Sequence, residues 1–388
     1  MSVILDYSLA LSVMRNASEA EVNDVFDRIN TYGHRLSDQE RRQAGVQNEF
    51  STMVRQIACS LRGDVSAEVL PLHLMPSISI DLPMTKHGYA VQADEVFWVN
   101  QGILLSTELR DSMDEQCIAD IAACIVGDKL IERAKDALDE IYRQGTSESD
   151  RVLNALEVYG SSKFSDEFKY CIDEILKVGL SGKPEKLRDI VFKKKTTNAF
   201  PSVFAILIIA FHELIIKDGE KVADYSGVKE ALRNLSERID TSRKATSPEE
   251  RRKNVDTVRG LVGKCFVKAD NAASQIYGNH TTIDIDSVIR RSEIELGNYE
   301  LKQGMLNLSE NGGVDENIMN KVVNTICAIA NNGPKSVGKI IIGVTDKDKD
   351  AERIHNIDNI NPKRIGKRFV VGVNREANRL GITIEQYF

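Results

Sequence analysis

Apolar positions recur every three to four residues along the first two thirds of the chain, a period that predicts amphipathic helices. Three serines stand three residues before a glutamate, the spacing of a capping box that opens a helix. The pairs are Ser18 with Glu21, Ser37 with Glu40, and Ser112 with Glu115. The first pair predicts an amphipathic helix over 18–30 and the second a short charged helix. The third predicts a helix that runs through Ile131 with a break at Gly127, and a further helix is expected over 49–61.

The longest apolar run, 203–211, lies inside a predicted helix over 200–217. A membrane-spanning helix needs about 20 apolar residues, so this run predicts a buried helix in a protein core. The polar tract 145–150 is expected to be a loop. The charged stretch 241–253 has the composition of a solvated connector, and it precedes a predicted helix over 255–276.

The last quarter of the chain has a different pattern. A helix is predicted over 316–331, and a buried strand over 338–346 that carries Asp346 out of the core into solvent. The apolar residues expected near one face of this helix are Ile318, Val322, Ile326 and Ile329. Helix followed by strand indicates an α/β unit.

These patterns predict an α+β protein whose N-terminal two thirds are mostly α-helical and whose smaller C-terminal domain is α/β. A length of 388 residues is enough for two or three domains. We expect domains at 1–110, 111–281 and 282–388.

Composition indicates an ordinary folded protein, with 42% hydrophobic and 28% charged residues. The six cysteines include no Cys-x-x-Cys pair, and the six histidines show no metal-ligand spacing, so neither a zinc site nor a disulfide framework is predicted. The N-terminus lacks the basic start of a secretory signal. We therefore expect a cytoplasmic protein with reduced thiols and no membrane association.

The charge is unevenly distributed. The chain carries a net charge of -7, while 282–388 holds 15 Lys and Arg against 15 Asp and Glu, so the acidic excess lies in 1–281. Within 335–379 there are 11 basic and 6 acidic residues, a local net charge of +5. The basic cluster consists of Lys363, Arg364, Lys367 and Arg368, with Arg375 and Arg379 further along. Such a patch is suited to phosphate contacts, and a solubilising helix face is the alternative interpretation.

A pattern in the last quarter resembles the Schlafen AlbA-like domain. It consists of Glu295, then Glu300-Leu301-Lys302, then a helix ending in Ala-Asn, and a strand reading Gly-x-Ile-Ile-Gly-Val-x-Asp. The resemblance covers about 292–388. Leu301 stands where Phe is usual, and 332–338 replaces a tighter Gly-Gly turn.

The resemblance implies a nucleic-acid-binding domain, possessing in its nuclease members a carboxylate triad that binds metal. Carried over to this chain, the catalytic and metal residues are Glu295, Glu300 and Asp346, with Mg²⁺ or Mn²⁺ as the metal. Lys302 would offset negative charge that develops during cleavage. The alternative is that these acids are solvated, since Asp346 alternates with lysines as a polar turn does.

A second pattern lies near the N-terminus, in Phe26, Arg28, Ile29, Asn30, Gly33, Leu36, Glu40 and Ala44. It resembles the ParB/sulfiredoxin-like domain of GmrSD-type restriction endonucleases. That family also carries an Asp-Gly-Gln-x-Arg motif, which this sequence lacks. Either the chain starts downstream of that motif or this half is not catalytic.

Together the two resemblances imply a prokaryotic nucleic-acid-processing protein that acts in defence against phage or foreign DNA. Three functions remain open: a metal-dependent endonuclease, a non-catalytic nucleic-acid-binding regulator, and an interaction scaffold for a catalytic partner. The expected partners are DNA or RNA, a second copy of the chain, or a defence-system subunit. The sequence leaves nucleotide dependence undecided.

Overall fold

The computed structural model describes residues 15, 17, 18, 21, 22, 25, 36–45, 47–64, 91–240, 242, 246–269, 285, 288, 289, 292, 299–308, 312–315, 317–331 and 338–387. Of these residues, 62% are helical and 8% lie in strands, which agrees with the predicted α+β class. We use "helical unit" for the described residues between 36 and 269, and "C-terminal unit" for those between 285 and 387.

The helical unit contains twelve α-helices among its described residues. They are α3 (Asp38–Ala44), α4 (Glu49–Arg62), α5 (Phe97–Asn100), α6 (Ser106–Arg110), α7 (Met113–Val126), α8 (Lys135–Tyr142), α9 (Ser147–Tyr159), α10 (Ser161–Leu180), α11 (Leu187–Val191), α12 (Pro201–His212), α13 (Tyr225–Leu232) and α14 (Pro248–Val262). Short turns of helix are η3 (Ala93–Glu95), η4 (Glu213–Lys217), η5 (Leu235–Glu237) and η6 (Gly263–Cys265). One antiparallel pair of strands, β1 (Glu220–Val222) and β2 (Phe266–Lys268), completes the unit.

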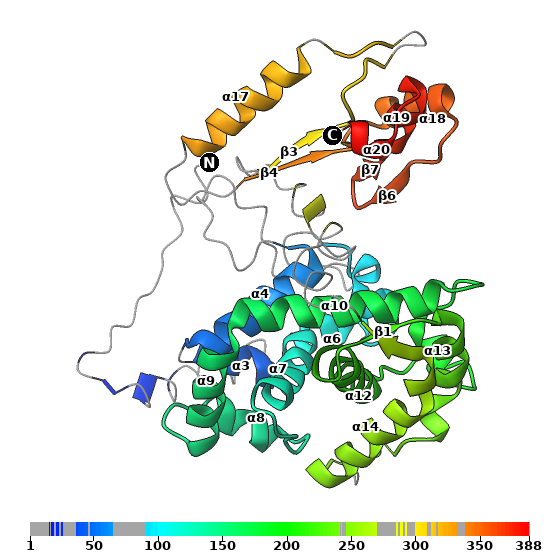
Figure 1. Cartoon of the computed structure of the whole chain (residues 1–388). Helices are drawn as coiled ribbons and strands as arrows, with labels where there is room; N and C mark the ends of the chain where they lie inside the picture. Colours follow the sequence, from blue (N-terminus) through cyan, green and yellow to red (C-terminus); the bar gives the residue numbers. More distant parts are fainter. Residues whose placement is uncertain are drawn as a thin grey trace.

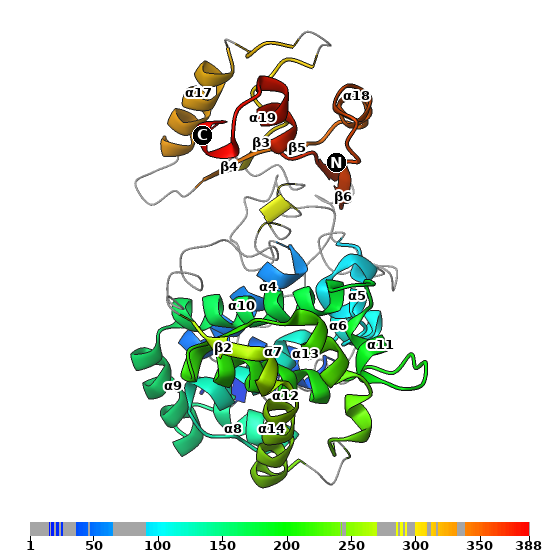
Figure 2. The ribbon, with the colours of Figure 1, turned by 45° about the vertical axis from the view of Figure 1, so that its right-hand side comes forward.

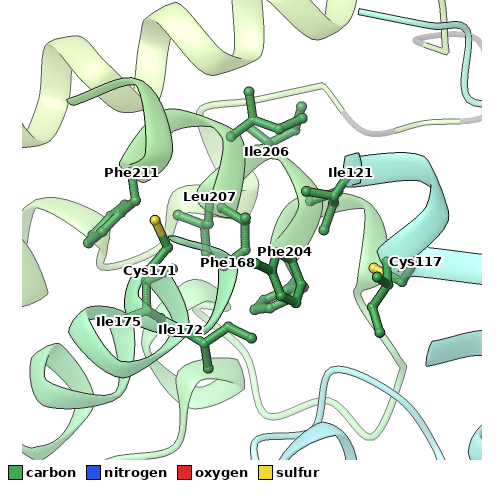
Figure 3. Packing of buried hydrophobic residues seen from close by; sticks show 14 of the residues in the cluster. Cys117, Ile121, Phe168, Cys171, Ile172, Ile175, Phe204, Ile206, Leu207 and Phe211 are labelled. Atoms are coloured by element: carbon green, nitrogen blue, oxygen red, sulfur yellow. The ribbon is translucent and has the colours of Figure 1, made fainter. Parts of the chain in front are cut away.

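The apolar run predicted to be a buried helix forms α12, with every residue from Val203 to His212 buried. Figure 1 views α12 nearly along its axis, and α7, α10 and α14 pack around it. In Figure 3, Phe204 and Leu207 of α12 lie beside Phe168 of α10. His212, at the end of α12, is a packed core residue as expected, because its Nε2 lies 3.1 Å from both Glu167 and Tyr159.

Helices whose start is encoded locally form as predicted. Ser37 and Glu40 make both hydrogen bonds of the capping box that begins α3. The predicted helix over 49–61 is α4, which ends at Gly63 in the left-handed conformation that favours glycine. The Ser18–Glu21 capping contact is also present, with the Ser18 backbone N–H 2.8 Å from the Glu21 carboxylate. Most of the helix predicted over 18–30 lies outside the described residues.

The third predicted capping box is wrong. Ser112 precedes α7, but its side chain makes no capping hydrogen bond. Glu115 is instead buried and lies 3.0 Å from Arg62 of α4, which also binds Asp114. The Glu115 carboxylate, which the local pattern predicted to cap the helix, therefore forms a long-range ion pair with Arg62 instead. The break at Gly127 is confirmed, since α7 ends at Val126.

Three predicted boundaries in this unit are corrected. The tract 145–150 is not all loop, because Thr146 accepts a hydrogen bond from the Ser149 N–H and α9 begins at Ser147. The connector predicted over 241–253 contains the start of α14, where Ser247 caps the helix and Pro248 occupies its first turn. The helix predicted over 255–276 ends at Val262 and is followed by β2.

One hydrophobic cluster extends through the helical unit from Phe50 to Phe266. It includes residues on both sides of the domain boundary predicted at 110. Figure 2 shows α4, α7, α10 and α12 in this unit from a second direction. None of the described helices is long and apolar enough to cross a membrane.

The C-terminal unit contains two small sheets. Its elements are β3 (Tyr299–Lys302), α17 (Ile318–Ala330), β4 (Lys339–Ile342), β5 (Val344–Thr345), α18 (Asp348–Asp358), β6 (Lys363–Ile365), β7 (Arg368–Val370), α19 (Asn374–Leu380) and α20 (Ile384–Tyr387). β3 pairs with β4 in parallel, with α17 as the connection between them, and β5, β7 and β6 form an antiparallel sheet. Figure 1 shows β3 and β4 side by side.

The strand predicted over 338–346 is divided between these two sheets. Gly343 has a φ of 97°, a conformation that favours glycine, and it separates β4 from β5. Its N–H donates to the Lys302 carbonyl at 2.7 Å, and its carbonyl accepts from the Val371 N–H at 2.8 Å. Val344 then enters a small core with Ile289 and Ile365.

The predicted helix over 316–331 forms as α17, but its apolar face differs from the prediction. Ile318 and Ile329 are buried as expected, whereas Ile326 is 53% exposed. Met319 and Val323 are also exposed large apolar residues on this helix.

Candidate nucleic-acid interface

The predicted basic cluster forms a β-hairpin. Lys363 and Arg364 lie on β6, Arg368 lies on β7, and the two-residue turn between the strands is Gly366-Lys367. Gly366 has a φ of 58°, as the tight turns of two-residue hairpins require. Ile365 anchors the hairpin because it is buried in the small core of the C-terminal unit.

Three cations of the hairpin face solvent. Lys363, Arg364 and Lys367 are all exposed. The Arg364 guanidinium lies 5.9 Å from the centre of the Phe369 ring, and its Nε donates to the Gly366 carbonyl at 2.9 Å. Arg364 and Phe369 are direct partners in the antiparallel register. Arg364 is therefore oriented by an aromatic ring and a carbonyl, and it forms no ion pair with any carboxylate in the described part of the chain.

Arg368 differs from the other three cations. Its side chain is only 15% exposed, and its Nη1 lies 3.3 Å from the Asp346 carboxylate. Its Nη2 donates to the Ser292 carbonyl at 2.7 Å. Arg368 therefore stabilises the C-terminal unit and contributes little free charge to the patch.

Arg375 and Arg379 do not extend the patch either. The Arg375 side chain is 1% exposed and lies 2.9 Å from Asp358, which also pairs with Arg379. Arg375 further contacts Glu376 and the Gln303 carbonyl. The positive charges of Arg375 and Arg379 are therefore neutralised inside the domain, by ion pairs that hold α18 and α19 together.

Glu300 and Lys302 lie two residues apart on β3, and side chains with this spacing project from the same face of a strand. They form an ion pair, with Glu300 36% and Lys302 19% exposed. The predicted catalytic lysine therefore balances the charge of the predicted catalytic glutamate.

The register of β3 and β4 decides how far Glu300 lies from Asp346 along the chain. Glu300 is opposite Ile340, six residues before Asp346, and the break at Gly343 between them carries the chain into the other sheet before it reaches Asp346. Glu295 lies outside the described residues. Among the residues that are described, no group of three His, Cys, Asp or Glu side chains is placed to hold a metal ion. The triad and its Mg²⁺ or Mn²⁺ stay a prediction.

Two residues of this unit with a role in the hairpin or in the loop after β3 were not predicted from the sequence. Phe369 could have been found from Lys-Arg-Ile-Gly-Lys-Arg-Phe, because a hairpin turning at Gly366 places it opposite Arg364. Glu376 had no sequence signal. Its buried carboxylate accepts hydrogen bonds from the backbone N–H groups of Met305 and Leu306, and so fixes the loop that follows β3.

No family model, curated protein or solved structure matches this chain. The Schlafen AlbA-like resemblance therefore rests on the residues quoted above. Of the GmrSD-like pattern, Phe26, Arg28 and Gly33 lie outside the described residues, while Glu40 is used in the capping box of α3. Both resemblances stay predictions.

Proposed function

We propose that the C-terminal unit binds nucleic acid through the β6–β7 hairpin. The observation that supports this proposal is the group of exposed cations at Lys363, Arg364 and Lys367. Cations that replace counterions on a phosphate backbone are the main source of affinity for nucleic acid. Because the whole chain carries a charge of -7, binding depends on the local position of these cations rather than on overall charge.

Phe369 favours single-stranded DNA or RNA as the ligand. Its ring is only partly buried, and it lies beside Arg364 on the hairpin. Proteins that bind single strands combine cations for the phosphates with aromatic rings on which bases stack. A duplex keeps its bases stacked on one another and offers this ring less contact.

Binding is tested by fluorescence anisotropy of the full chain with single-stranded DNA, single-stranded RNA and duplex DNA over a range of salt concentrations. The variant Lys363→Glu with Arg364→Glu should bind more weakly. Its slope of log affinity against log salt should be flatter by about 1.4, since each single-strand phosphate contact contributes about 0.7. A matched control is Lys194→Glu with Lys195→Glu, which reverses two exposed cations of the helical unit. An unchanged slope in the hairpin variant would remove the hairpin from the interface.

Metal-dependent cleavage is the second candidate function, and the Glu300–Lys302 pair favours it. A partly exposed carboxylate beside a lysine on one strand face provides a metal ligand and a cation for developing charge. Single strands and duplexes should be incubated with Mg²⁺, Mn²⁺ or EDTA. Cleavage that stops with EDTA and with Glu300→Gln would support an endonuclease, and binding without cleavage under either metal would support a regulator. A role in prokaryotic defence rests on the two sequence resemblances.

The scaffold function has less support. Large exposed apolar residues of the described helical unit are Leu105, Val158, Leu180 and Val267. They lie in or beside four different elements. Val158 precedes α10 and Leu180 is the last residue of that helix, which is about 30 Å long. A docking surface for a partner subunit needs a contiguous apolar patch.

A further inference from the structure

A cavity of about 310 Å³ lies in the helical unit, far along the sequence from the hairpin. It is lined by residues of α7, by the segment from Arg133 to Leu138, and by the first turn of α12. A smaller cavity of about 30 Å³ shares Arg133 and Ser202 with it and reaches Arg251 of α14. The larger volume is at the lower end of the range for small-molecule sites.

The charges that line the two cavities leave one cation in excess. Both lining carboxylates are paired: Asp38 lies 3.2 Å from Lys135, and Asp120 lies 2.8 Å from Arg251. Arg133 is the remaining charged residue of the lining. The cavities are therefore electropositive by one charge.

The position of Arg133 is set by its backbone. Its N–H donates to the Thr246 carbonyl at 2.9 Å, and the Thr246 hydroxyl donates to Glu132 at 3.4 Å. These two hydrogen bonds join Glu132 and Arg133 to Thr246, which also lines the cavity. The Arg133 guanidinium itself makes no hydrogen bond or ion pair with the part of the chain that the structure describes, so it is available to a ligand.

The N-terminus of α12 opens into the same cavities. Pro201 occupies the first turn and has no N–H, and the N-cap residue Phe200 makes no side-chain capping bond. The backbone N–H groups of Ser202 and Val203 have no acceptor among the described residues. Ser202 lines both cavities. Free N–H groups and the helix dipole together favour an anion at this position.

Arg251 is an independent sign of a missing acceptor. Its side chain is 3% exposed, and its Nη1 and Nη2 atoms bind Asp120 and the Ile131 carbonyl at 2.8 Å. Its Nε is buried without a hydrogen-bond partner in the described chain. Buried polar atoms are rarely left unpaired, so this nitrogen lacks the acceptor that such atoms usually have.

A cysteine mechanism does not fit this cavity. Cys117 lines it, but burial raises the pKa of the Cys117 thiol to about 12. A neutral thiol is a poor nucleophile, so the cavity is better suited to binding than to covalent chemistry.

We propose that this cavity is a binding site for a phosphate group, free or carried by a small phosphate monoester. The phosphate oxygens accept from the Ser202 N–H group, and the Arg133 guanidinium pairs with the phosphate charge. Arg guanidinium and helix N-termini are the two donors that proteins use most directly for phosphate. The site is separate from the hairpin proposed to bind nucleic acid.

The test is a thermal-unfolding titration of the full chain with inorganic phosphate and with a nucleoside 5′-monophosphate, at constant ionic strength set with chloride. A ligand that binds only the folded state raises Tm in a saturable way. A rise with inorganic phosphate identifies free phosphate as sufficient. A rise only with the monophosphate identifies a monoester as the ligand.

Two variants connect the response to the cavity. Arg133→Gln should weaken binding at least about tenfold, as loss of a charge-assisted contact does. Ser202→Asp places a carboxylate where the phosphate would bind. It should raise the Tm of the unliganded protein and remove the response to ligand, a combination that loss of folding cannot produce.

Two controls separate this site from other surfaces. Arg143→Gln removes the same charge at an exposed position outside the cavity and should bind as wild type does. Lys363→Glu with Arg364→Glu should also keep the response, because the hairpin is not part of this site. The proposal is overturned if neither ligand raises Tm, or if Arg133→Gln binds with unchanged affinity.

Discussion

The Asp346 carboxylate lies 3.3 Å from the Arg368 guanidinium. Their sequence patterns predict two different sites for these residues, a metal centre for Asp346 and a phosphate-binding patch for Arg368. β5 and β7 pair with Thr345 opposite Phe369, and in an antiparallel pair the next positions along are Asp346 and Arg368. Asp346 therefore neutralises the Arg368 charge that predicted a phosphate contact. Arg368 in turn neutralises the Asp346 charge that predicted a metal ligand.

Asp346→Asn should strengthen nucleic-acid binding. Without its carboxylate partner, Arg368 gains freedom to contact a phosphate, and the salt slope should steepen by up to about 0.7. Anisotropy titrations against salt measure this change. If Asp346 is a metal ligand, the same variant would instead lose Mg²⁺- or Mn²⁺-dependent cleavage, which the EDTA-controlled assay detects.

Phe369→Leu should weaken single-strand binding while the hairpin stays folded. Leucine keeps an apolar side chain on β7 but removes the ring that orients Arg364 and stacks with a base. Loss of about 1 kcal/mol corresponds to roughly fivefold weaker binding. Duplex binding should change less. Equal losses for single strands and duplexes would show that the ring does not contact bases.

Gly343→Ala should destabilise the C-terminal unit. An added Cβ would lie 3.1 Å from the Gly372 backbone, and a φ of 97° is strained for any residue with a side chain. We expect a cost on the order of 1–3 kcal/mol, measured by urea unfolding and by faster hydrogen exchange in β5 and β7. Gly313→Ala is the matched control, since a Cβ there meets nothing within 4 Å. Equal stability of the two variants would contradict this account of the strand break.

Glu185→Gln should remove part of the acid sensitivity of the helical unit. Hydrogen bonds from Arg233 and Lys229 lower the pKa of Glu185 from its ordinary 4.5 to about 2. Because the folded-state pKa is the lower one, the stabilisation is complete above about pH 4.5 and is lost as pH falls towards 2.

The difference in unfolding free energy between wild type and Glu185→Gln should therefore be largest near pH 7 and shrink below about pH 4.5. Urea unfolding at several pH values measures it. Glu157→Gln, at an exposed position with no ion pair to a described residue, should show no such pH dependence. A constant difference down to about pH 3 would argue against the lowered pKa.

Sequence alone determined the elements whose causes lie within a few residues. Ser37 and Glu40 satisfy each other's backbone N–H groups across one helical turn, so α3 begins where the capping pattern predicts. The apolar run from Val203 to Phe211 must be buried wherever it packs, and it became the centre of the helical unit. Lys363, Arg364 and Lys367 of the hairpin are exposed, as lysine and arginine usually are.

Tertiary structure decided the pairings between distant residues. Ser112 and Glu115 have the same spacing as Ser37 and Glu40, yet Glu115 binds Arg62, a residue more than 50 positions away. Arg251, in a stretch whose composition predicted solvent exposure, is buried against Asp120. A buried charge needs a partner, and which partner is available depends on how helices pack rather than on local sequence.

The pairing of charges in the candidate sites was also decided by tertiary structure. The sequence contained Glu300, Asp346 and the basic cluster, but strand register and the break at Gly343 decided that Glu300 pairs with Lys302 and Asp346 with Arg368. The cavity beside Arg133 has no local signal at all, because its lining comes from segments that only the packing of α7, α12 and α14 brings together. Local hydrogen bonds are specified by neighbours in sequence, whereas charge pairing and cavities are specified by register and packing.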